Sequence, residues 1–438
     1  METSAAPAIT VATLPGCASR LLGDLAGHTR QDYPAYRALG GYRPLAVPDE
    51  LLDDVERSGL QGRGGAAFPL GLKLRTVRDN GRLTGGAGGT VVVANGEEGE
   101  PASIKDRWLL RHRPHLVLDG LRLAAAIVEA DRAYVYVSDT ESARRVETAL
   151  TELEPGVFAD VPVELWRVDP GYIAGEETAV TRAINGGPVK PTDKPPRPFQ
   201  AGVGGRPTLV SNVETLANLA YLQQHGSAEF RSQGTSLSPG TFLVTVTGAS
   251  RPPGLYEIPH GLPFTELLAL HGVSQEKVQG ALLGGYFAGL LNRAVLDVTL
   301  DHETLRGLGS GLGCGAIGLI TDDCPVAVAA SVLAYFDREN AGQCGSCFNG
   351  TAAMAAVAGA LRDSAATTDD VDRLRRWSVV LRGRGACATL DAATNVAASL
   401  LDQFPREVAN HLDASCQVCR GDPFRANRPY QAEAPRPT

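Results

Sequence analysis

The apolar positions in the first half of the chain predict strands that alternate with helices. β-Branched runs at residues 91–94, 133–137 and 163–168 are typical of buried strands. Apolar side chains at helical spacing predict helices over about 114–130 and 141–153. Because strands that alternate with helices form βαβ units, we expect an α/β domain with a mostly parallel sheet.

The rest of the chain shows other patterns. Residues 1–50 are predicted to form a loose N-terminal arm, and a helix at 49–58 is expected to end at Gly59, which easily adopts the left-handed conformation. From about 240 the pattern predicts a small α+β module, with a helix at 264–271 and strands at 241–247, 254–258 and 294–300. Helical periods that favour a bundle follow at 325–336, 350–362, 369–381 and 392–412. The tail after Arg420 is rich in Pro and polar residues and is predicted to be disordered.

Composition narrows the class of protein. Among 438 residues, 41 Lys and Arg stand against 49 Asp and Glu, which gives a net charge of −8. This balance argues against a nucleic-acid surface, which needs a basic stripe. The first residues lack the basic start of a secretory signal, and no apolar run reaches the roughly 18 residues of a membrane span. We therefore expect a cytoplasmic protein.

The first motif is the glycine-rich segment GRGGAAFPLGLK at 62–73. Glycines such as Gly62 and Gly64 allow the backbone to approach a phosphate or a flavin ring, and Lys73 adds a positive charge. The spacing formally matches a dinucleotide fingerprint, but a helix precedes it where that fingerprint requires a strand. A plain tight loop is the alternative interpretation.

Two further motifs follow predicted strands, in loops where parallel sheets usually bind ligands. The segment NGEEGEP at 95–101 offers carboxylates that could accept hydrogen bonds from sugar hydroxyls; a solvated charged loop is the alternative. The segment GYIAGEET at 171–178 opens a predicted helix, whose free N–H groups suit an anion. Its acidic residues could instead cap the helix dipole.

The fourth motif consists of cysteines. Cys344 and Cys347 form a Cys-x-x-Cys pair, Cys387 follows about forty residues later, and Cys416 and Cys419 form a second pair. Such pairs can present thiolates to zinc or to an iron–sulfur cluster. A single buried cysteine, by contrast, usually behaves as a small apolar residue.

The order of these motifs resembles the NADH-binding, FMN-carrying subunit of respiratory complex I (the 51-kDa-type flavoprotein subunit) and its relatives in formate dehydrogenases and bidirectional hydrogenases. The corresponding segments are GRGGAAFPLGLK, NGEEGEPA, YIAGEETAV and KPPRPFQAGVGGRPTLVSNVETL. The resemblance extends from about Leu51 to about Leu412. It implies an α/β Rossmann-like FMN-binding domain, a β-grasp (soluble ligand-binding) module and a C-terminal helical-bundle iron–sulfur domain.

The resemblance also implies domain boundaries and site residues. The expected segments are the arm at 1–50, the FMN- and NAD(P)H-binding domain at 51–238, the β-grasp module at 239–304, the iron–sulfur domain at 305–415, and a Cys-x-x-Cys with disordered tail at 416–438. The residues implied to hold FMN are Gly62, Arg63, Gly64, Lys73, Asn95, Glu97, Tyr172, Gly175, Glu176 and Asn212. Those implied to contact NAD(P)H are Phe68, Glu100, Glu177 and Arg197, and the implied metal ligands are Cys344, Cys347 and Cys387.

The implied activity is electron input. Hydride would pass from NAD(P)H to FMN, and electrons would leave singly through an iron–sulfur cluster, [4Fe–4S] or [3Fe–4S], to a ferredoxin-like acceptor. No side chain is expected to act as a catalytic acid or base. The expected partners are an iron–sulfur redox protein and a larger redox complex, which could lie at the periphery of a membrane.

Three positions depart from the family pattern. Ala341 stands where the family has the first cysteine of its cluster motif, so we expect a non-cysteine ligand, a [3Fe–4S] form, or a substitute such as Cys416 or Cys419. Arg197 and Thr76 replace aromatic residues that stack on the nucleotide. Because arginine can pair with a phosphate, Arg197 suggests that NADPH is accepted.

Two alternatives remain open from the sequence. The altered nucleotide pocket favours a flavoprotein that takes electrons from ferredoxin and has little pyridine-nucleotide activity. A non-catalytic scaffold subunit with structural metal is the other alternative.

Overall fold

The computed structural model describes residues 9–23, 29–45, 47–83, 89–159 and 161–434. These residues divide into two compact units. Unit 1 comprises Glu100–Ser103, Leu243–Ala434 and the described part of Met1–Pro15, and unit 2 comprises the described parts of Gly16–Gly99 and Ile104–Phe242. The predicted domain boundaries stay predictions.

Unit 2 is built on a four-stranded parallel sheet in the order β4-β3-β2-β5, as the strand–helix alternation predicts. The strands are β2 (Thr90–Asn95), β3 (Ala130–Val137), β4 (Val163–Arg167) and β5 (Thr208–Asn212). The helices are α1 (Tyr33–Ala38), α2 (Pro48–Ser58), α3 (Leu70–Leu83), α4 (Lys105–His112), α5 (Pro114–Val128), α6 (Thr140–Glu152), α7 (Glu177–Ile184) and α8 (Val213–Phe230), with a 3-10 turn η2 (Val203–Gly205). The predicted helix before Gly59 is confirmed, and Gly59 has a φ of 68°.

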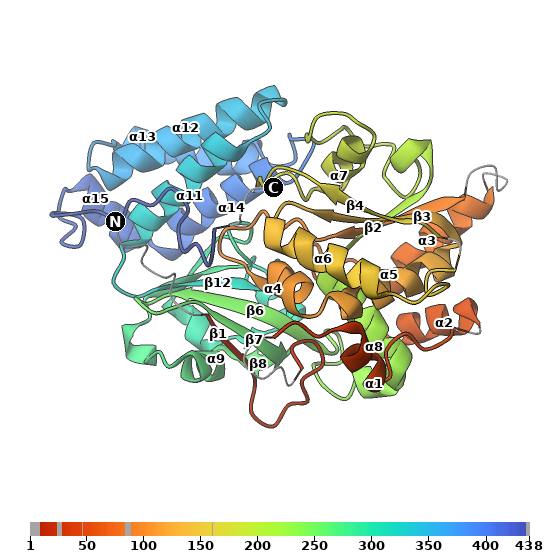
Figure 1. Cartoon of the computed structure of the whole chain (residues 1–438). Helices are drawn as coiled ribbons and strands as arrows, with labels where there is room; N and C mark the ends of the chain where they lie inside the picture. The colour runs from red at the N-terminus through yellow and green to blue at the C-terminus, as the bar shows by residue number, and fades with distance from the viewer. Residues whose placement is uncertain (1–8, 24–28, 46, 84–88, 160, 435–438) are drawn as a thin grey trace, which may run out of the picture. The chain divides into compact units, whose positions relative to one another are not determined.

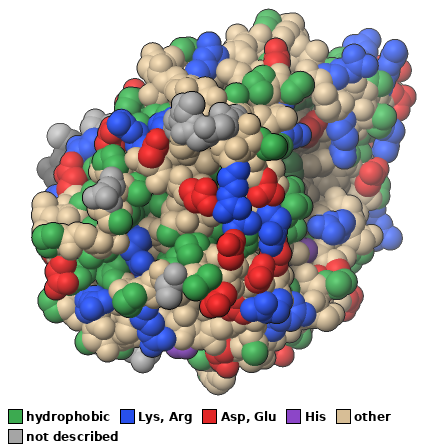
Figure 2. Space-filling view, turned by 90° about the vertical axis from the view of Figure 1, so that its right-hand side faces the viewer, with side chains coloured by type: hydrophobic (Ala, Val, Ile, Leu, Met, Phe, Trp, Pro, Cys, Tyr) green, Lys and Arg blue, Asp and Glu red, His purple; other side chains and the backbone are tan. Residues whose placement is uncertain are grey.

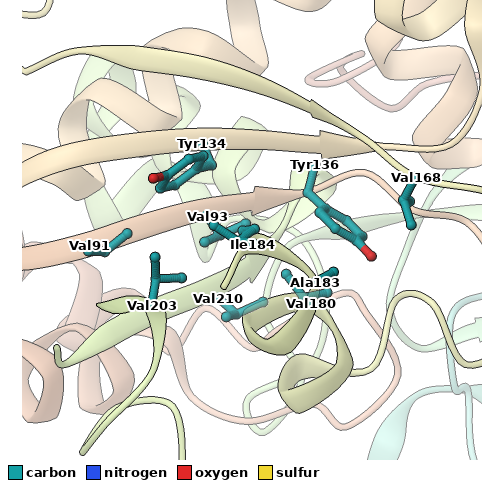
Figure 3. Close-up of a cluster of buried hydrophobic side chains, with 10 residues drawn as sticks. All are labelled: Val91, Val93, Tyr134, Tyr136, Val168, Val180, Ala183, Ile184, Val203 and Val210. Atoms are coloured by element: carbon teal, nitrogen blue, oxygen red, sulfur yellow. The ribbon is translucent and has the colours of Figure 1, made fainter. Parts of the chain in front are cut away.

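Helix α7 covers one face of this sheet, whereas α5 and α6 cover the other (Figure 1). Figure 3 shows the core between the sheet and α7, where Val91, Val93 and Tyr136 of the strands meet Val180 and Ile184 of the helix, among other apolar side chains. Each strand alternates its side chains between the two faces, so both faces need apolar residues. This explains the continuous buried run in β2.

Two contacts position the loop before α7 and the helix α8. The hydroxyl of Tyr136 donates a hydrogen bond of 3.1 Å to the carbonyl of Ala174, in the loop before α7. On the opposite face, a Cβ at Gly120 of α5 would lie only 1.9 Å from the carbonyl oxygen of Leu216 in α8. Only glycine allows these two helices to cross so closely.

Unit 1 contains a six-stranded mixed sheet in the order β1-β7-β6-β12-β9-β10 and a two-stranded pair β11-β8. Its strands are β1 (Thr10–Thr13), β6 (Thr241–Gly248), β7 (Gly254–Pro259), β8 (Leu262–Pro263), β9 (Gly280–Leu283), β10 (Leu290–Asn292), β11 (Thr299–Leu300) and β12 (Ala316–Ile320). Short helices α9 (Phe264–His271) and α10 (His302–Gly307) and 3-10 turns η3 (Gln275–Lys277) and η4 (Arg293–Asp297) connect them. The sheet takes β1 and β12 from outside the predicted module.

The expected strand at 294–300 is wrong for most of its length. Residues Arg293–Asp297 form a 3-10 helix, and only Thr299–Leu300 pair as a strand. The cause is local, because the side chain of Asn292 accepts a hydrogen bond of 2.9 Å from the amide of Ala294 and caps the helical turn.

Five helices complete unit 1 and lie together in Figure 1. They are α11 (Pro325–Glu339), α12 (Gly345–Arg362), α13 (Thr368–Val380), α14 (Thr389–Gln403) and α15 (Pro405–Leu412). The expected helix at 392–412 is therefore two helices. Proline has no amide hydrogen and its ring clashes with the preceding turn, so α14 ends before Pro405 and a new helix starts there.

The predicted disorder of the tail is wrong for the described residues up to 434. Tyr430 is partly buried, and its hydroxyl donates a hydrogen bond of 3.0 Å to Asp323 Oδ2. The amide of Ala432 donates one of 2.9 Å to the carbonyl of Pro101. The aromatic ring of Tyr430 supplies the apolar contact that the polar composition of the tail concealed, because it lies against Gly318 of β12.

The expected loose arm at 1–50 is also ordered in its described parts. Residues of β1 pair with β7 in unit 1, and α1 belongs to unit 2. Asp32 caps α1 by accepting a hydrogen bond from Ala35, and Tyr36 donates one of 2.9 Å to the buried Asp119. The sequence analysis also missed α3, α4, α8, β5, β9, β10 and β12.

On the face shown in Figure 2, Lys and Arg side chains are interspersed with Asp and Glu, and no large patch has a single sign. None of the helices in the described ranges combines the length and the apolar character that a membrane crossing requires.

Candidate functional site

Three of the sequence motifs meet at the carboxyl edge of the unit 2 sheet. In the parallel pairing of β2 with β5, Asn95 lies beside Asn212. Asn95 Nδ2 also donates a hydrogen bond of 2.8 Å to the carbonyl of Gly175. The acidic loop, the loop before α7 and the start of α8 therefore lie next to one another, where α/β sheets bind ligands.

Glycines make these close approaches possible. A Cβ at Gly175 would lie 2.9 Å from the carbonyl oxygen of Glu97, and one at Gly64 would lie 3.2 Å from Cβ of Asn212. A Cβ at Gly99 would lie 2.9 Å from Cα of Tyr172. The distances at Gly175 and Gly99 are shorter than a side chain tolerates. The distance at Gly64 shows that the glycine-rich loop lies against the same edge of the sheet.

Glu97 is the acidic side chain in this region with an unused oxygen. It is 6% exposed, and its Oε1 accepts a hydrogen bond of 3.2 Å from the amide of Gly171. Its Oε2 is buried and has no hydrogen-bond partner among the described residues. Burial raises the pKa of Glu97 to about 7, against the opposing effects of Ser138 and Gly171. A buried oxygen in this state is an acceptor for a ligand.

The neighbouring carboxylate of Glu98 has a structural role. Its two oxygens accept hydrogen bonds of 3.1 Å each from the amides of Asp106 and Arg107, at the start of α4. It also pairs with the guanidinium of Arg107 at 3.1 Å. The alternative of a solvated charged loop is therefore wrong, because Glu97 and Glu98 are both buried.

Glu100 belongs to unit 1, unlike the other residues expected at the nucleotide. Its Oε2 accepts a hydrogen bond of 2.9 Å from the amide of Tyr286. Its Oε1 accepts one of 3.2 Å from Ala102. Within unit 1 it thus anchors its own loop.

Glu176 has the helix-capping role that the sequence analysis kept as an alternative. Its Oε2 accepts hydrogen bonds from the amides of Thr178 at 2.8 Å and Ala179 at 3.1 Å. Its Oε1 pairs with Lys194 Nζ at 2.7 Å. Both oxygens therefore have partners within the protein.

Glu177, one residue further, faces three cations. Lys194 lies 3.6 Å from it, and Lys73 and Arg197 lie 3.9 Å from it. The Arg197 side chain is 54% exposed, so its guanidinium can reach a ligand in solvent. Phe68 is 49% exposed and likewise remains accessible.

The side chains of Lys73 and Arg63 each donate a hydrogen bond to a backbone carbonyl group. Lys73 Nζ donates a hydrogen bond of 2.6 Å to the carbonyl of Val210; burial lowers its pKa, and Glu177 opposes this shift. The buried Arg63 side chain donates to the carbonyl of Thr241 at 3.0 Å, and burial lowers its pKa to about 10. The Arg63 guanidinium therefore stabilises the loop.

The sequence analysis missed a buried ionic network beneath Asn212. Lys105 Nζ lies 2.7 Å from Asp106 and 3.0 Å from Glu214. Asn212 Nδ2 donates a hydrogen bond of 2.7 Å to Asp106, and its Oδ1 caps α8 by accepting one of 3.0 Å from Glu214. Burial raises the pKa of Asp106, and Lys105 opposes this shift. No spacing links residues 105–106 with 214, so only the fold reveals the network.

In unit 1, the three predicted metal ligands approach one another. Cys344 precedes the first turn of α12, and its Sγ accepts a hydrogen bond of 3.4 Å from the amide of Ala386, next to Cys387. Burial raises the pKa of Cys347 to about 12, with further contributions from Cys387 and Cys344. Three thiolates fit an iron–sulfur cluster that takes its remaining ligand from elsewhere.

The surroundings of Cys416 and Cys419 argue against the hypothesis that one of them supplies the missing thiolate. Both lie with Cys324 and His411 in a separate group of side chains. Cys416 Sγ is 4.0 Å from Cys324 Sγ. The thiols that act on the pKa of Cys419 are Cys324 and Cys416, whereas Cys347 responds to Cys344 and Cys387.

Comparisons with known proteins agree with this arrangement. Residues 55–221 match the family model of the Nuo51 FMN-binding domain, and residues 327–411 match the iron–sulfur binding region of NADH-ubiquinone oxidoreductase-F. The fold and these matches define a flavin- and iron–sulfur-binding redox protein.

Individual relatives cover most of the chain. It is 33% identical over 401 residues to the F 2 component of the NADH-quinone oxidoreductase of Rhizobium meliloti, covering 86% of this chain and 94% of that protein. It is 31% identical over 398 residues to the HndC component of the NADP-reducing hydrogenase of Solidesulfovibrio fructosivorans, covering 86% and 80%. The chain belongs to the family of F-type components of NADH-quinone oxidoreductase.

A solved structure shares the fold. An NAD+-reducing [NiFe]-hydrogenase in the air-oxidized state matches with a TM-score of 0.76 and 30% identity over 84% of this chain. The match covers 63% of the hydrogenase chain, so this chain spans less than two thirds of that length. The likeness confirms a mixed α/β fold with parallel strands.

These findings confirm the family resemblance, the FMN-binding domain and the iron–sulfur region. The geometry also fits FMN, because glycine backbones, Lys73 and the unused Oε2 of Glu97 lie along one sheet edge or beside it. The individual roles assigned to the site residues stay predictions.

Proposed function

We propose that this chain is an FMN-dependent electron-input flavoprotein that oxidises NAD(P)H and passes electrons through an iron–sulfur centre to a ferredoxin-like acceptor. Family membership supports the class of reaction. The observation that carries the FMN site is the buried, unpartnered Oε2 of Glu97. FMN, when bound, supplies two-electron acceptance and one-electron release.

The residues of unit 2 would bind and orient the flavin. Gly62 and Gly64 allow the backbone to approach it, and Lys73 supplies a positive charge. Glu97 Oε2 would accept a hydrogen bond from a flavin hydroxyl. Asn95, Tyr172, Gly175 and Asn212 would form the rest of the cradle, while Arg63 and Glu176 would support it through the contacts described above.

The nucleotide would bind near Glu177, with Phe68 as a further contact. The accessible guanidinium of Arg197 supports NADPH as a substrate, because a planar cation pairs with a 2′-phosphate. In an Arg197→Phe variant we expect the NADPH KM to rise at least about tenfold, with NADH turnover retained. Arg197→Lys, which keeps the charge, is the matched control. Unchanged NADPH kinetics in Arg197→Phe would refute the phosphate role.

The finer architecture is also proposed here. The chain would have three parts: a Rossmann-like flavin domain, a β-grasp module around β6 to β11, and a helical region that carries the cluster on Cys344, Cys347 and Cys387. A separate small iron–sulfur protein would accept the electrons in the cytoplasm, at the periphery of a larger redox complex. The relatives named as subunits support this placement.

One observation favours a second direction of electron flow. Thr76 stands where the family stacks an aromatic ring, and its hydroxyl bonds to the carbonyl of Leu72 at 2.7 Å. Together with Arg197 this removes two stacking surfaces. If neither NADH nor NADPH reduces the flavin, the chain would instead receive electrons from ferredoxin.

The test of the FMN site uses the titration of Glu97. The ionised carboxylate is the better acceptor, so FMN binding competes with protonation below the pKa of about 7. We expect FMN affinity to fall as pH drops from 8 to 5.5, by up to about tenfold per pH unit below 7. Glu97→Gln should weaken binding at pH 8 by about tenfold and lose this part of the pH dependence.

Fluorescence titration of the full chain with FMN measures both effects. The FMN phosphate titrates in the same range, but it does so in both proteins, so the difference between them isolates Glu97. Glu164→Gln, at an exposed carboxylate, is the matched control and should change neither quantity. A protein that cannot be reconstituted with FMN would overturn the proposal.

A further inference from the structure

Four potential metal ligands converge in unit 1 outside the family's cysteine motif. The Sγ atoms of Cys324, Cys416 and Cys419 and a ring nitrogen of His411 all lie within 4.8 Å of one another. Cys324 Sγ is 3.2 Å from His411 Nε2 and 4.0 Å from Cys416 Sγ. The four atoms come from two segments of the chain, because Cys324 is 87 positions from His411 whereas His411, Cys416 and Cys419 lie within nine residues.

We propose that these side chains bind one Zn²⁺ in a mononuclear, tetrahedral Cys3His site. Three thiolates and one imidazole form a ligand set of structural zinc centres. All four positions are filled by protein, which leaves none open for a substrate. The site is therefore a structural tie, separate from the iron–sulfur ligands Cys344, Cys347 and Cys387.

The distances favour a single ion over a cluster. With Zn–S bonds of about 2.3 Å, tetrahedral geometry sets neighbouring sulfurs about 3.8 Å apart and a sulfur and a nitrogen about 3.6 Å apart. The observed sulfur–nitrogen distance from Cys324 is 3.2 Å and the observed sulfur–sulfur distance is 4.0 Å, and both are close to these values. In a [4Fe–4S] cluster each cysteine binds a different iron, so the thiolates are spread around a larger body. The compact group suits one metal ion.

The fold brings the ligands together through three chain features. Cys324 directly precedes α11, and His411 lies in the last turn of α15. Ala414 has a positive φ of 51°, and the amide of Ser415 donates a hydrogen bond of 2.7 Å to the carbonyl of Asn410. This turn reverses the chain direction after α15, so that Cys416 lies back against α15.

Burial divides the ligands into an inner and an outer pair. Cys324 is 2% exposed and His411 is fully buried, whereas Cys416 and Cys419 are partly exposed. The inner pair belongs to the packed helices, and the outer pair belongs to the segment that follows them. A metal ion can enter from the outer side and fasten that segment to the helices.

The proposed metal would add to the contacts that hold the polar tail within unit 1. Beyond the ligands, Arg425 pairs with Asp363 at 2.7 Å and Tyr430 bonds to Asp323. The exposed Arg425–Asp363 ion pair contributes little free energy. A metal bound by both helices and tail adds binding free energy that an unfolded chain cannot gain.

The experiment measures metal content in the full chain. Protein purified from zinc-containing medium and treated with a mild chelator should hold one zinc per chain, measured by mass spectrometry, in addition to cluster iron. Cys416→Ser/Cys419→Ser should lose the zinc and keep the iron, while Cys344→Ser/Cys347→Ser should do the reverse. Gln417→Ala, between the two ligands, is the matched control and should change neither metal.

Cobalt substitution gives a second readout. Co²⁺ in the wild-type chain should show the intense visible bands of a tetrahedral thiolate site, and His411→Cys, which keeps four ligands, should retain metal with shifted bands. The proposal is overturned if zinc is absent from the wild type, or if zinc persists in the Cys416→Ser/Cys419→Ser variant. Loss of iron and sulfide with a retained fold in that variant would assign these residues to the cluster instead.

Discussion

Unit 1 contains two Cys-x-x-Cys pairs with different surroundings. Cys344 and Cys347 lie at the start of α12, near Cys387, and the family resemblance predicts that Ala341 stands in place of a further cysteine. Cys416 and Cys419 lie in a non-helical segment, where Cys324 and His411 complete a set of four within 4.8 Å.

In the proposal made above, the same short motif would therefore serve two kinds of centre. The spacing of a pair guarantees only that two thiols can bind one metal or cluster. The identity of the centre depends on which further ligands the fold places near the pair and on the distances between the ligand atoms. Four experiments test this distinction.

The largest effect is expected at the first pair. Cys347→Ser removes one of three thiolates, so the cluster should be lost and one-electron acceptor reduction should fall at least about 100-fold. Flavin reduction by nucleotide, followed by absorbance under anaerobic conditions, should persist. If acceptor reduction survives in the variant, electrons do not leave through this centre.

Zinc removal should affect stability more than electron transfer. A ligand present at about a thousandfold excess over its Kd stabilises the folded state by about 4 kcal/mol. A zinc-selective chelator should therefore lower the Tm of the unit 1 transition by roughly 10 °C, measured by calorimetry, with iron retained. An equal fall in the Cys416→Ser/Cys419→Ser variant would show that the chelator acts elsewhere.

Ala341→Cys should have a smaller, favourable effect. It restores the thiolate that the family motif provides, so the cluster should shift toward four irons per chain and survive longer in air. Iron analysis and electron paramagnetic resonance measure the change. Identical spectra in the two proteins would mean that another side chain already fills the fourth position.

The smallest effect is expected at Cys17, which belongs to neither group. Cys17→Ser should change the unfolding free energy by less than about 0.5 kcal/mol and leave both metals unchanged. Denaturant unfolding and metal analysis check this. A lost metal would reveal a ligand that neither group contains.

The sequence predicted much of unit 2 because its signals are local. Periodicity located β2, β3, β4, α5 and α7, and Gly59 marked the end of α2. The sheet edge as a ligand site followed from the βαβ order. The resemblance then assigned Asn95, Glu97 and Asn212 to one site, and the register of β2 with β5 agrees with two of them being neighbours.

Other features depend on long-range packing and could not be predicted. The three carboxylates of the acidic loop look alike in sequence, but burial and amide donors make Glu97, Glu98 and Glu100 different. His411 precedes Cys416 by five positions, a spacing that metal ligands use and that the sequence analysis did not recognise, whereas Cys324 is 87 positions from His411 and only the fold brings the two together.

The close crossing of α5 and α8 at Gly120 makes the candidate site depend on a residue that does not line it. A methyl group at this position would push on Leu216, near the start of α8, and α8 is capped by Asn212. The displacement would reach the sheet edge through a rigid helix. A genetic screen for chains that fail to retain their yellow colour should therefore recover substitutions at Gly120, on the opposite side of the sheet from α7.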